Sequence, residues 1–173
     1  MRPTLGRECT PRGHQLESRG QLAELGVEGM VLGENPALHH VGIVVADIDT
    51  AISRYIGLGF SGGDRFAMTE QGVIAVTFQS GANYIELIQP TDPDGPIARF
   101  KAKRGEGLHH VAYRVESIET SLADLASKGV RLIDFTPRAG AHGWRIAFIH
   151  PESCGGVLTE LVEVPGEDAG ERS

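Results

Sequence analysis

The residues best able to do chemistry in this sequence are two histidines and two glutamates at repeat-related positions. His40 lies in the segment LHHVGIVV, and His110 lies in LHHVAYRV seventy residues further on. Each segment is followed by a carboxylate in an apolar run, Glu86 in IELI and Glu160 in VLTELV. Imidazole nitrogens and carboxylate oxygens form a mixed ligand set that suits several divalent transition metals. The four residues therefore predict a metal site shared by two copies of one unit.

Each of these residues also has an ordinary structural explanation. An ionised carboxylate is costly to bury without a partner, so Glu86 and Glu160 could instead point to solvent from edge strands. His40 and His110 could be hydrogen-bonded polar groups of the core. Because all four recur together in register with the repeat, the metal site is favoured over these alternatives.

The segments that carry the histidines alternate between apolar and other residues, which predicts strands over 38–45 and 108–115. One face of each strand must pack on a helix, and the period of two sends His40 and His110 to the opposite, concave face. The same parity places their neighbours, His39 and His109, on the helix side as structural residues.

A helix and three further strands complete each copy. The first copy predicts strands near 60–62, 72–79 and 83–89, and the second predicts strands at 130–135, 144–149 and 156–164. The sequence thus indicates an α+β fold with two tandem βαβββ modules, 38–89 and 108–164. The connector 90–107 carries a short expected helix over 96–103.

The remaining segments complete the domain boundaries. We expect one domain over 36–166, preceded by an N-terminal extension (1–35) that is flexible or loosely docked and followed by an acidic, frayed tail (167–173). The extension has balanced charges and no continuous apolar stretch, so it is not a secretory signal.

Two segments of the chain are candidates for contact with a ligand. Lys101, Lys103 and Arg104 form a basic cluster, which is either a solvated helix face or, for Lys101 and Arg104 in particular, a site for a phosphorylated ligand. His142 and Gly143 lie in the glycine-rich run AGAHG, which we expect to lack regular structure and to approach a ligand closely.

Composition excludes several classes of protein. The net charge of −7 argues against nucleic acid as a partner, because phosphate binding requires a basic face. No run approaches the roughly 18 apolar residues of a membrane helix. The two cysteines cannot form a disulfide framework, which agrees weakly with a reducing, cytoplasmic location.

With these residues in view, the sequence resembles the vicinal oxygen chelate superfamily of glyoxalases, bleomycin resistance proteins and dioxygenases. The histidine and glutamate pattern is general to that superfamily, whereas the segments around 140–143 and 148–161 are more specific and resemble methylmalonyl-CoA epimerases. The segments that carry the resemblance are LHHVGIVV (38–45), YIELIQP (84–90), GPIARF (95–100), GLHH (107–110), GAHG (140–143) and FIHPESCGGVLTEL (148–161).

The resemblance implies a half-open, glyoxalase-like barrel and an isomerase. Such an enzyme would interconvert (2R)- and (2S)-methylmalonyl-CoA through a metal-stabilised enolate, with Glu160 and Glu86 as acid and base. Its ligand set would be His40, Glu86, His110 and Glu160 around one divalent ion, cobalt, zinc, nickel or manganese (Co, Zn, Ni or Mn). Its partner would be an acyl-CoA, and the superfamily habit is a homodimer.

The sequence departs from the epimerase pattern at one position. Some bacterial epimerases have glutamine in place of Glu86 and a catalytic glutamate in place of Ala75. Alanine cannot act as a base, so the identity of the second base is open. Two alternatives to the epimerase also stay open: a glyoxalase I-like lactoylglutathione lyase, and a non-catalytic small-molecule binding or resistance protein of the same fold.

Overall fold

A computed structural model describes residue 32 and residues 36–166 of the chain. The chain divides after residue 30 into two units, and the second, 31–173, holds every element described below. The expected extension and tail lie outside the described residues, apart from Leu32, which packs against the core of the second module. None of the helices described is long and apolar enough to cross a membrane.

Two tandem βαβββ modules make up the described part of the chain, as the repeat predicts. The first consists of β1 (Leu38–Val44), α2 (Ile48–Gly57), β2 (Asp64–Met68), β3 (Val73–Ser80) and β4 (Asn83–Pro90), with a single 3-10 turn, η1 (Thr69–Gln71), between β2 and β3. The second consists of β5 (Gly107–Arg114), α4 (Ile118–Ser127), β6 (Arg138–Ala139), β7 (Arg145–Ile149) and β8 (Thr159–Glu163). The connector forms the expected short helix, α3 (Pro96–Arg104).

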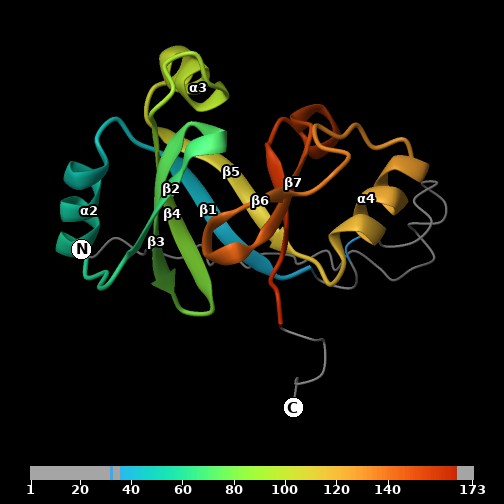
Figure 1. Ribbon diagram of the computed structural model, residues 1–173, viewed down its shortest axis with the longest axis horizontal. Helices are drawn as coiled ribbons and strands as arrows, with labels where there is room; N and C mark the ends of the chain where they lie inside the picture. The colour runs from blue at the N-terminus through green and yellow to red at the C-terminus, as the bar shows by residue number, and fades with distance from the viewer. Residues whose placement is uncertain (1–31, 33–35, 167–173) are drawn as a thin grey trace, which may run out of the picture. The chain divides into compact units, whose positions relative to one another are not determined.

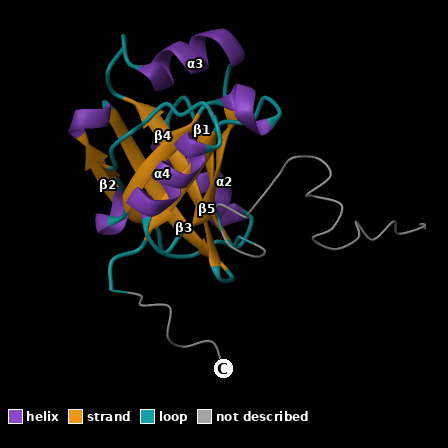
Figure 2. Cartoon of the chain, turned by 90° about the vertical axis from the view of Figure 1, so that its right-hand side faces the viewer, coloured by secondary structure: helices purple, strands orange, loops and turns teal. Residues whose placement is uncertain are grey.

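All strands join one eight-stranded sheet in the order β2-β3-β4-β1-β5-β8-β7-β6. The first strands of the two modules, β1 and β5, pair antiparallel at its centre, and each runs parallel to the last strand of its own module. Figure 1 shows α2 and α4 at opposite sides of the strands and α3 at the top. Figure 2 shows how strongly the sheet curls around its inner face. The predicted fold class is therefore confirmed.

The last strand of each module also holds the start of that module's helix. The first N–H groups of a helix have no partner within it. Gln89 Oε1 accepts a hydrogen bond from Ile48 N (2.7 Å), and Glu163 Oε2 accepts one from Ile118 N (2.8 Å). These equivalent bonds fix each helix on the outer face of the sheet and leave the inner face free for the site.

Three apolar clusters stabilise this arrangement. Two lie where α2 packs on β3 and β4 and where α4 packs on β7 and β8. The third includes Ala112, Trp144 and Val162. Burying side chains of this size stabilises a fold by about 1.5–3 kcal/mol each.

Two of the predicted strands are wrong. Residues 60–62 form no strand, because Phe60 packs on Tyr55 and Phe78 and because Gly62 and Gly63 have positive φ angles of 73° and 122°. The edge strand is β2, four residues later.

Residues 130–135 form no strand either, and the expected strand 156–164 is confined to β8. Over 130–135 the only ladder contact within the described residues is a bridge between Leu132 and Ile149. Two consecutive N–H groups, those of Ile133 and Asp134, both donate to Phe148 O, which breaks the alternation that a strand needs. The glycine-rich run is also more ordered than predicted, since Ala139 belongs to β6 and Ala141–Gly143 forms a 3-10 turn.

Candidate active site

Pairing across the central strands brings the predicted ligands together. Gly42 on β1 lies opposite His110 on β5 and beside Glu86 on β4. A methyl group at this position would lie 2.1 Å from Cε1 of His110, so the histidine ring occupies the space that a side chain would fill. Gly42 is therefore required by the placement of His110.

The second module repeats this pattern with its own residues. Ala112 on β5 lies opposite His40 on β1 and beside Glu160 on β8. In each module a small residue lies two positions after the ligand histidine and pairs with the glutamate of the same module. The approximate two-fold relation that the repeat predicts holds at the level of strand register.

The four side chains are buried and their polar atoms converge. Nε2 of His40 lies 2.9 Å from Nε2 of His110, and Glu160 Oε2 lies 2.9 Å from His110 Nε2 and 3.6 Å from His40 Nε2. Glu86 Oε2 lies 3.6 and 3.7 Å from the same two nitrogens. His40, Glu86 and His110 offer donor atoms that all lie within 4.8 Å of one another, a group that could bind a metal ion. Two carboxylates buried together need positive charge, so the donor set fits a divalent cation.

The two carboxylates differ in their electrostatic surroundings. Burial raises the pKa of Glu86, and the nearby histidines offset this only in part. Burial also acts on Glu160, but the charge of His110 and hydrogen bonds from His110 and His40 lower its pKa to about 2. For His40, burial is opposed by the hydrogen bond to Glu160, which leaves its pKa raised. Glu160 is thus the carboxylate that ionises more readily.

The neighbouring histidines do not lie where parity predicts. The ring of His39 contacts Trp144 on the inner face, at 4.4 Å between centroids, and His109 lines the cavity described below. The β1–β5 register shifts between Leu38 and His40, and this irregularity breaks the period of two at His39. Burial lowers the pKa of His39 to about 3 and that of His109 to about 4, so both rings are neutral at neutral pH.

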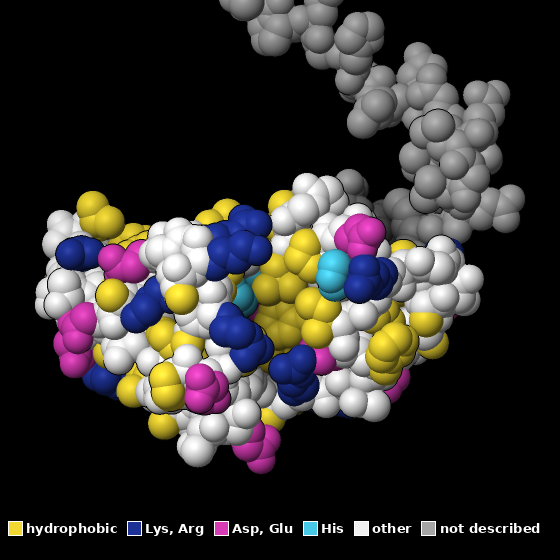
Figure 3. Space-filling view, turned by 90° about the horizontal axis from the view of Figure 1, so that it is seen from above, with side chains coloured by type: hydrophobic (Ala, Val, Ile, Leu, Met, Phe, Trp, Pro, Cys, Tyr) yellow, Lys and Arg dark blue, Asp and Glu magenta, His cyan; other side chains and the backbone are white. Residues whose placement is uncertain are grey.

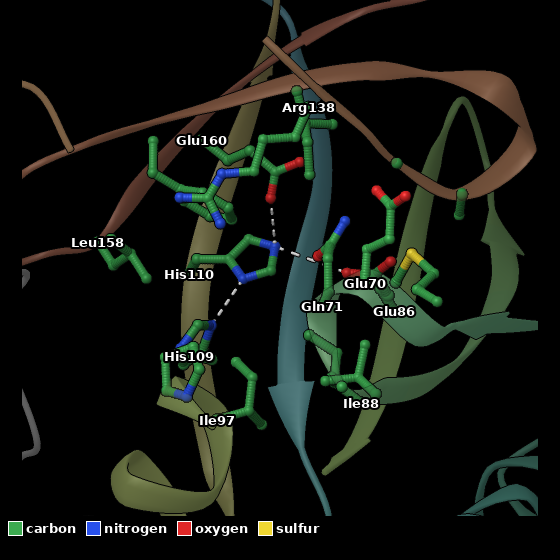
Figure 4. A pocket seen from close by; sticks show the side chains of 18 of the residues that line it. Glu70, Gln71, Glu86, Ile88, Ile97, His109, His110, Arg138, Leu158 and Glu160 are labelled. Atoms are coloured by element: carbon green, nitrogen blue, oxygen red, sulfur yellow. Dashed lines mark hydrogen bonds and ion pairs between the residues drawn. The ribbon is translucent and has the colours of Figure 1, made fainter. Parts of the chain in front are cut away.

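A cavity of about 490 Å³ opens above the four residues. Figure 4 shows His110 between Glu160 and Glu86, with His109 below it and Arg138 above. Figure 3, a view from above, shows an apolar hollow with Lys and Arg side chains at its border. Three residues of the lining, Trp144, Phe148 and Arg138, were not predicted from the sequence. Arg138 is ion-paired with Asp134 and lies over the Phe148 ring at 5.9 Å.

None of the four predicted substrate-binding residues lines this cavity. His142 and Gly143 line an adjoining groove that shares Gln71 and Arg138 with it. His142 has φ 53° and its Nε2 lies 2.7 Å from Thr77 Oγ1, a contact between the modules. Lys101 and Arg104 lie in the last turn of α3, outside the lining of both hollows, and their contact with substrate stays a prediction.

Comparison with known proteins agrees with this geometry. The sequence profile of the Glyoxalase/Bleomycin resistance protein/Dioxygenase superfamily matches residues 39–148. The chain belongs to this superfamily. An uncharacterized protein of Bacillus subtilis is 41% identical over 137 residues, which cover 78% of this chain and 96% of that protein. The mitochondrial methylmalonyl-CoA epimerase of Bos taurus is 38% identical over 126 residues, 72% of each chain.

A solved structure extends this likeness to a substrate complex. The structure of a methylmalonyl-CoA epimerase with methylmalonyl-CoA and NH4+ has a TM-score of 0.73 and 36% identity, covering 76% of this chain and 96% of that one. The resemblance to the superfamily, and within it to methylmalonyl-CoA epimerases, is thereby confirmed. So is the curled half-barrel predicted for a glyoxalase-like fold.

Proposed function

We propose that this member of the superfamily is an epimerase that interconverts (2R)- and (2S)-methylmalonyl-CoA. One observation carries the proposal: four buried nitrogen and oxygen donors form the floor of an apolar cavity in a chain that is similar to methylmalonyl-CoA epimerases. His40, Glu86, His110 and Glu160 would hold one divalent cation, with cobalt, zinc, nickel and manganese as candidates for this donor set. When bound, the cation supplies positive charge that stabilises an oxyanion next to the carbon that loses its proton.

The carboxylates supply the proton transfers. Two carboxyl groups whose surroundings push their pKa values apart divide the roles of acid and base. Glu160 has the lowered pKa, so it is the carboxylate ready to remove the C2 proton. Glu86 has the raised pKa and is the better proton donor for the opposite face.

The position that carries a base in some bacterial epimerases contributes nothing here. Ala75 lies on β3 with its side chain buried and is not part of the cavity lining. The assignment of the second role to Glu86 follows from this, because Glu86 is a carboxylate on the strand next to β3 and its side chain lines the cavity.

The wider surface suits an acyl-CoA. The apolar walls, among them Ile88, Trp144 and Phe148, exclude water from the carbon acid and strengthen electrostatic effects inside the site. Lys101 and Arg104 would meet the phosphates of CoA, and His142 and Gly143 would border the acyl chain. We also propose a homodimer, a cytoplasmic location and a single domain over residues 36–166.

Hydrogen exchange at C2 tests the proposal directly. Purified, metal-loaded protein is incubated with one epimer of methylmalonyl-CoA in D2O, and deuterium at C2 and the epimer ratio are followed together. Deuterium entry with convergence of the epimers is the expected result. If the protein converts a glutathione hemithioacetal and no deuterium enters methylmalonyl-CoA, it is a lyase instead. Binding of small molecules without any turnover would show a resistance-type binding protein.

A further inference from the structure

Each candidate ligand histidine is hydrogen-bonded to the histidine that precedes it. Nδ1 of His40 lies 2.8 Å from Nδ1 of His39, and Nδ1 of His110 lies 2.9 Å from Nδ1 of His109. The two contacts use the same atoms and are related by the internal repeat. They occur on the side of each ligand ring that faces away from the other ligands, because Nε2 of His40 and Nε2 of His110 face each other.

Only one proton lies between the two Nδ1 atoms of such a pair, and its position decides which ring donates and which accepts. A histidine that binds a cation through Nε2 must carry its proton on Nδ1. The Nδ1–H groups of His40 and His110 then donate, and the Nδ1 atoms of His39 and His109 accept. In the reverse arrangement the protons would sit on Nε2 of His40 and His110 and block the atoms that converge on the carboxylates.

His39 meets this requirement at a cost to stability. As the acceptor it carries its own proton on Nε2, and that atom is buried with no hydrogen-bond partner in the described structure. An unsatisfied buried polar group destabilises the folded protein. A leucine at this position would avoid the unsatisfied nitrogen, so a histidine here points to a role beyond packing.

Aromatic neighbours hold both outer rings in place. His39 contacts Trp144 at 4.4 Å and Tyr84 at 5.5 Å between centroids. His109 meets Phe100 edge-on at 4.7 Å, and Figure 4 shows it next to Ile97. Neither ring can turn without losing these contacts, so the acceptor atoms stay fixed in front of the ligand rings.

We infer that His39 and His109 are positioning residues that set the tautomer and orientation of His40 and His110 for metal binding. The inference rests on the metal site of the proposed function. It assigns to each module a pair of histidines with distinct duties, one that faces the cation and one that accepts the ligand's proton.

The test uses a matched pair of substitutions at each position. Asparagine places Oδ1 where histidine has Nδ1 and keeps an acceptor, whereas leucine has a similar shape and lacks one. Long-range 15N–1H correlation spectra of the Zn²⁺-loaded protein report the tautomer of each histidine, and competition titration with Co²⁺ and a chelator reports affinity. Unfolding temperature is recorded for each variant, and Leu108→Ala is the control, because this exposed residue lies next to His109 and does not line the cavity.

We expect Nδ1–H on His40 and His110, and Nε2–H on His39 and His109, in the Zn²⁺-loaded parent chain. His39→Leu and His109→Leu should weaken Co²⁺ binding about 10–100-fold. The asparagine variants and Leu108→Ala should keep the affinity of the parent. If His39→Leu does not fold, the His109 pair on the half-buried side decides the question alone.

The outcomes separate this inference from the proposed function. Protons on Nδ1 of His39 and His109 in the Zn²⁺-loaded parent, or leucine variants with unchanged affinity, would overturn the inference even if the protein is an epimerase. Absence of Co²⁺ binding in the parent would overturn the metal site, and with it both proposals. Loss of affinity in the asparagine variants as well would reduce the role to packing.

Discussion

The two modules contribute the same residue types to the site and surround them differently. In the first, Gly42 leaves room for His110, Glu86 has a raised pKa, and His39 is sealed behind Trp144. In the second, Ala112 fits without displacement, the pKa of Glu160 is lowered, and His109 borders the cavity. The repeat therefore conserves the positions of the donors, while the neighbours make one half of the site more acidic than the other. In a reaction that removes a proton on one face and returns it on the other, one carboxylate must start ionised and the other protonated, and this inequality favours that state.

The largest expected effect comes from removing the part that the modules share. His40→Ala and His110→Ala should each weaken metal binding by about tenfold or more, and the double variant should bind none, because each histidine supplies one of two nitrogen donors. Elemental analysis after gel filtration measures the metal content. A full complement of metal in the double variant would show that the site lies elsewhere.

Exchanging the carboxylates one at a time tests their inequality. Glu160→Gln keeps an oxygen donor but loses the ionised base, so we expect metal to be retained at reduced affinity and turnover to fall by roughly 10²–10⁴. Glu86→Gln also keeps an oxygen donor but loses the proton donor of our assignment, so we expect epimerisation to fall while deuterium exchange by Glu160 persists.

Metal content and C2 exchange are measured on both glutamine variants. Near-normal exchange in Glu160→Gln, with a large loss in Glu86→Gln, would reverse the two roles.

The small residues beside the glutamates give a test of packing. Gly42→Ala should push the His110 ring aside, because the added carbon would lie 2.1 Å from Cε1, and metal affinity should fall by at least about tenfold. The matched change in the other module, Ala112→Gly, should leave affinity unchanged and reduce stability by about 0.5–1 kcal/mol. Co²⁺ titration and urea unfolding measure the two quantities. Equal affinities in both variants would mean that the rings repack freely.

The outer histidines should make the metal-free protein sensitive to acid. Their folded pKa values, about 3 for His39 and about 4 for His109, lie below the value near 6.5 expected in the unfolded chain. Between those limits the unfolded chain binds more protons. This contribution to stability is therefore fully present above about pH 6.5 and is lost as the pH falls toward about 4 and 3.

Urea unfolding of the metal-free protein at pH 7, 6 and 5, with and without His109→Asn, checks this dependence. The variant should show a shallower slope by about one proton, because asparagine does not titrate. Comparison with the parent cancels the opposite contribution of His40. An unchanged slope would mean that His109 is protonated in the folded protein.

Local patterns in the sequence predict most of the fold and the centre of the site. Strong alternation defines β1 and β5, and the repeat identifies His40, Glu86, His110 and Glu160 as partners before any contact is known. The edge strands escape prediction because β6 has two residues and β2 mixes charged and apolar ones, so neither shows the alternation that identifies a strand.

The outer part of the site was harder to predict for a different reason. The irregularity in register at His39 is a tertiary feature that strict parity cannot include. A signal was nevertheless present, because the dipeptide His-His occurs twice in register and both of its members are repeated. Trp144 and Arg138 carry no such signal, since they reach the cavity only through the course of the chain between α4 and β7.

The order of strands also determines where the two modules are joined by side-chain contacts and not by strand pairing. The sheet ends at two free edges, β2 and β6, and side chains join the modules near this line through Gln71 Nε2, which donates to Ala139 O (2.6 Å), and through the Thr77–His142 contact. Separation of β2 from β6 breaks no strand pairing, because the backbones of the two modules pair at β1 and β5. The four donor residues lie on the central strands β1 and β5 and on the strands beside them, β4 and β8. A separation of the edges would therefore leave the pairing of the strands that carry the donors intact.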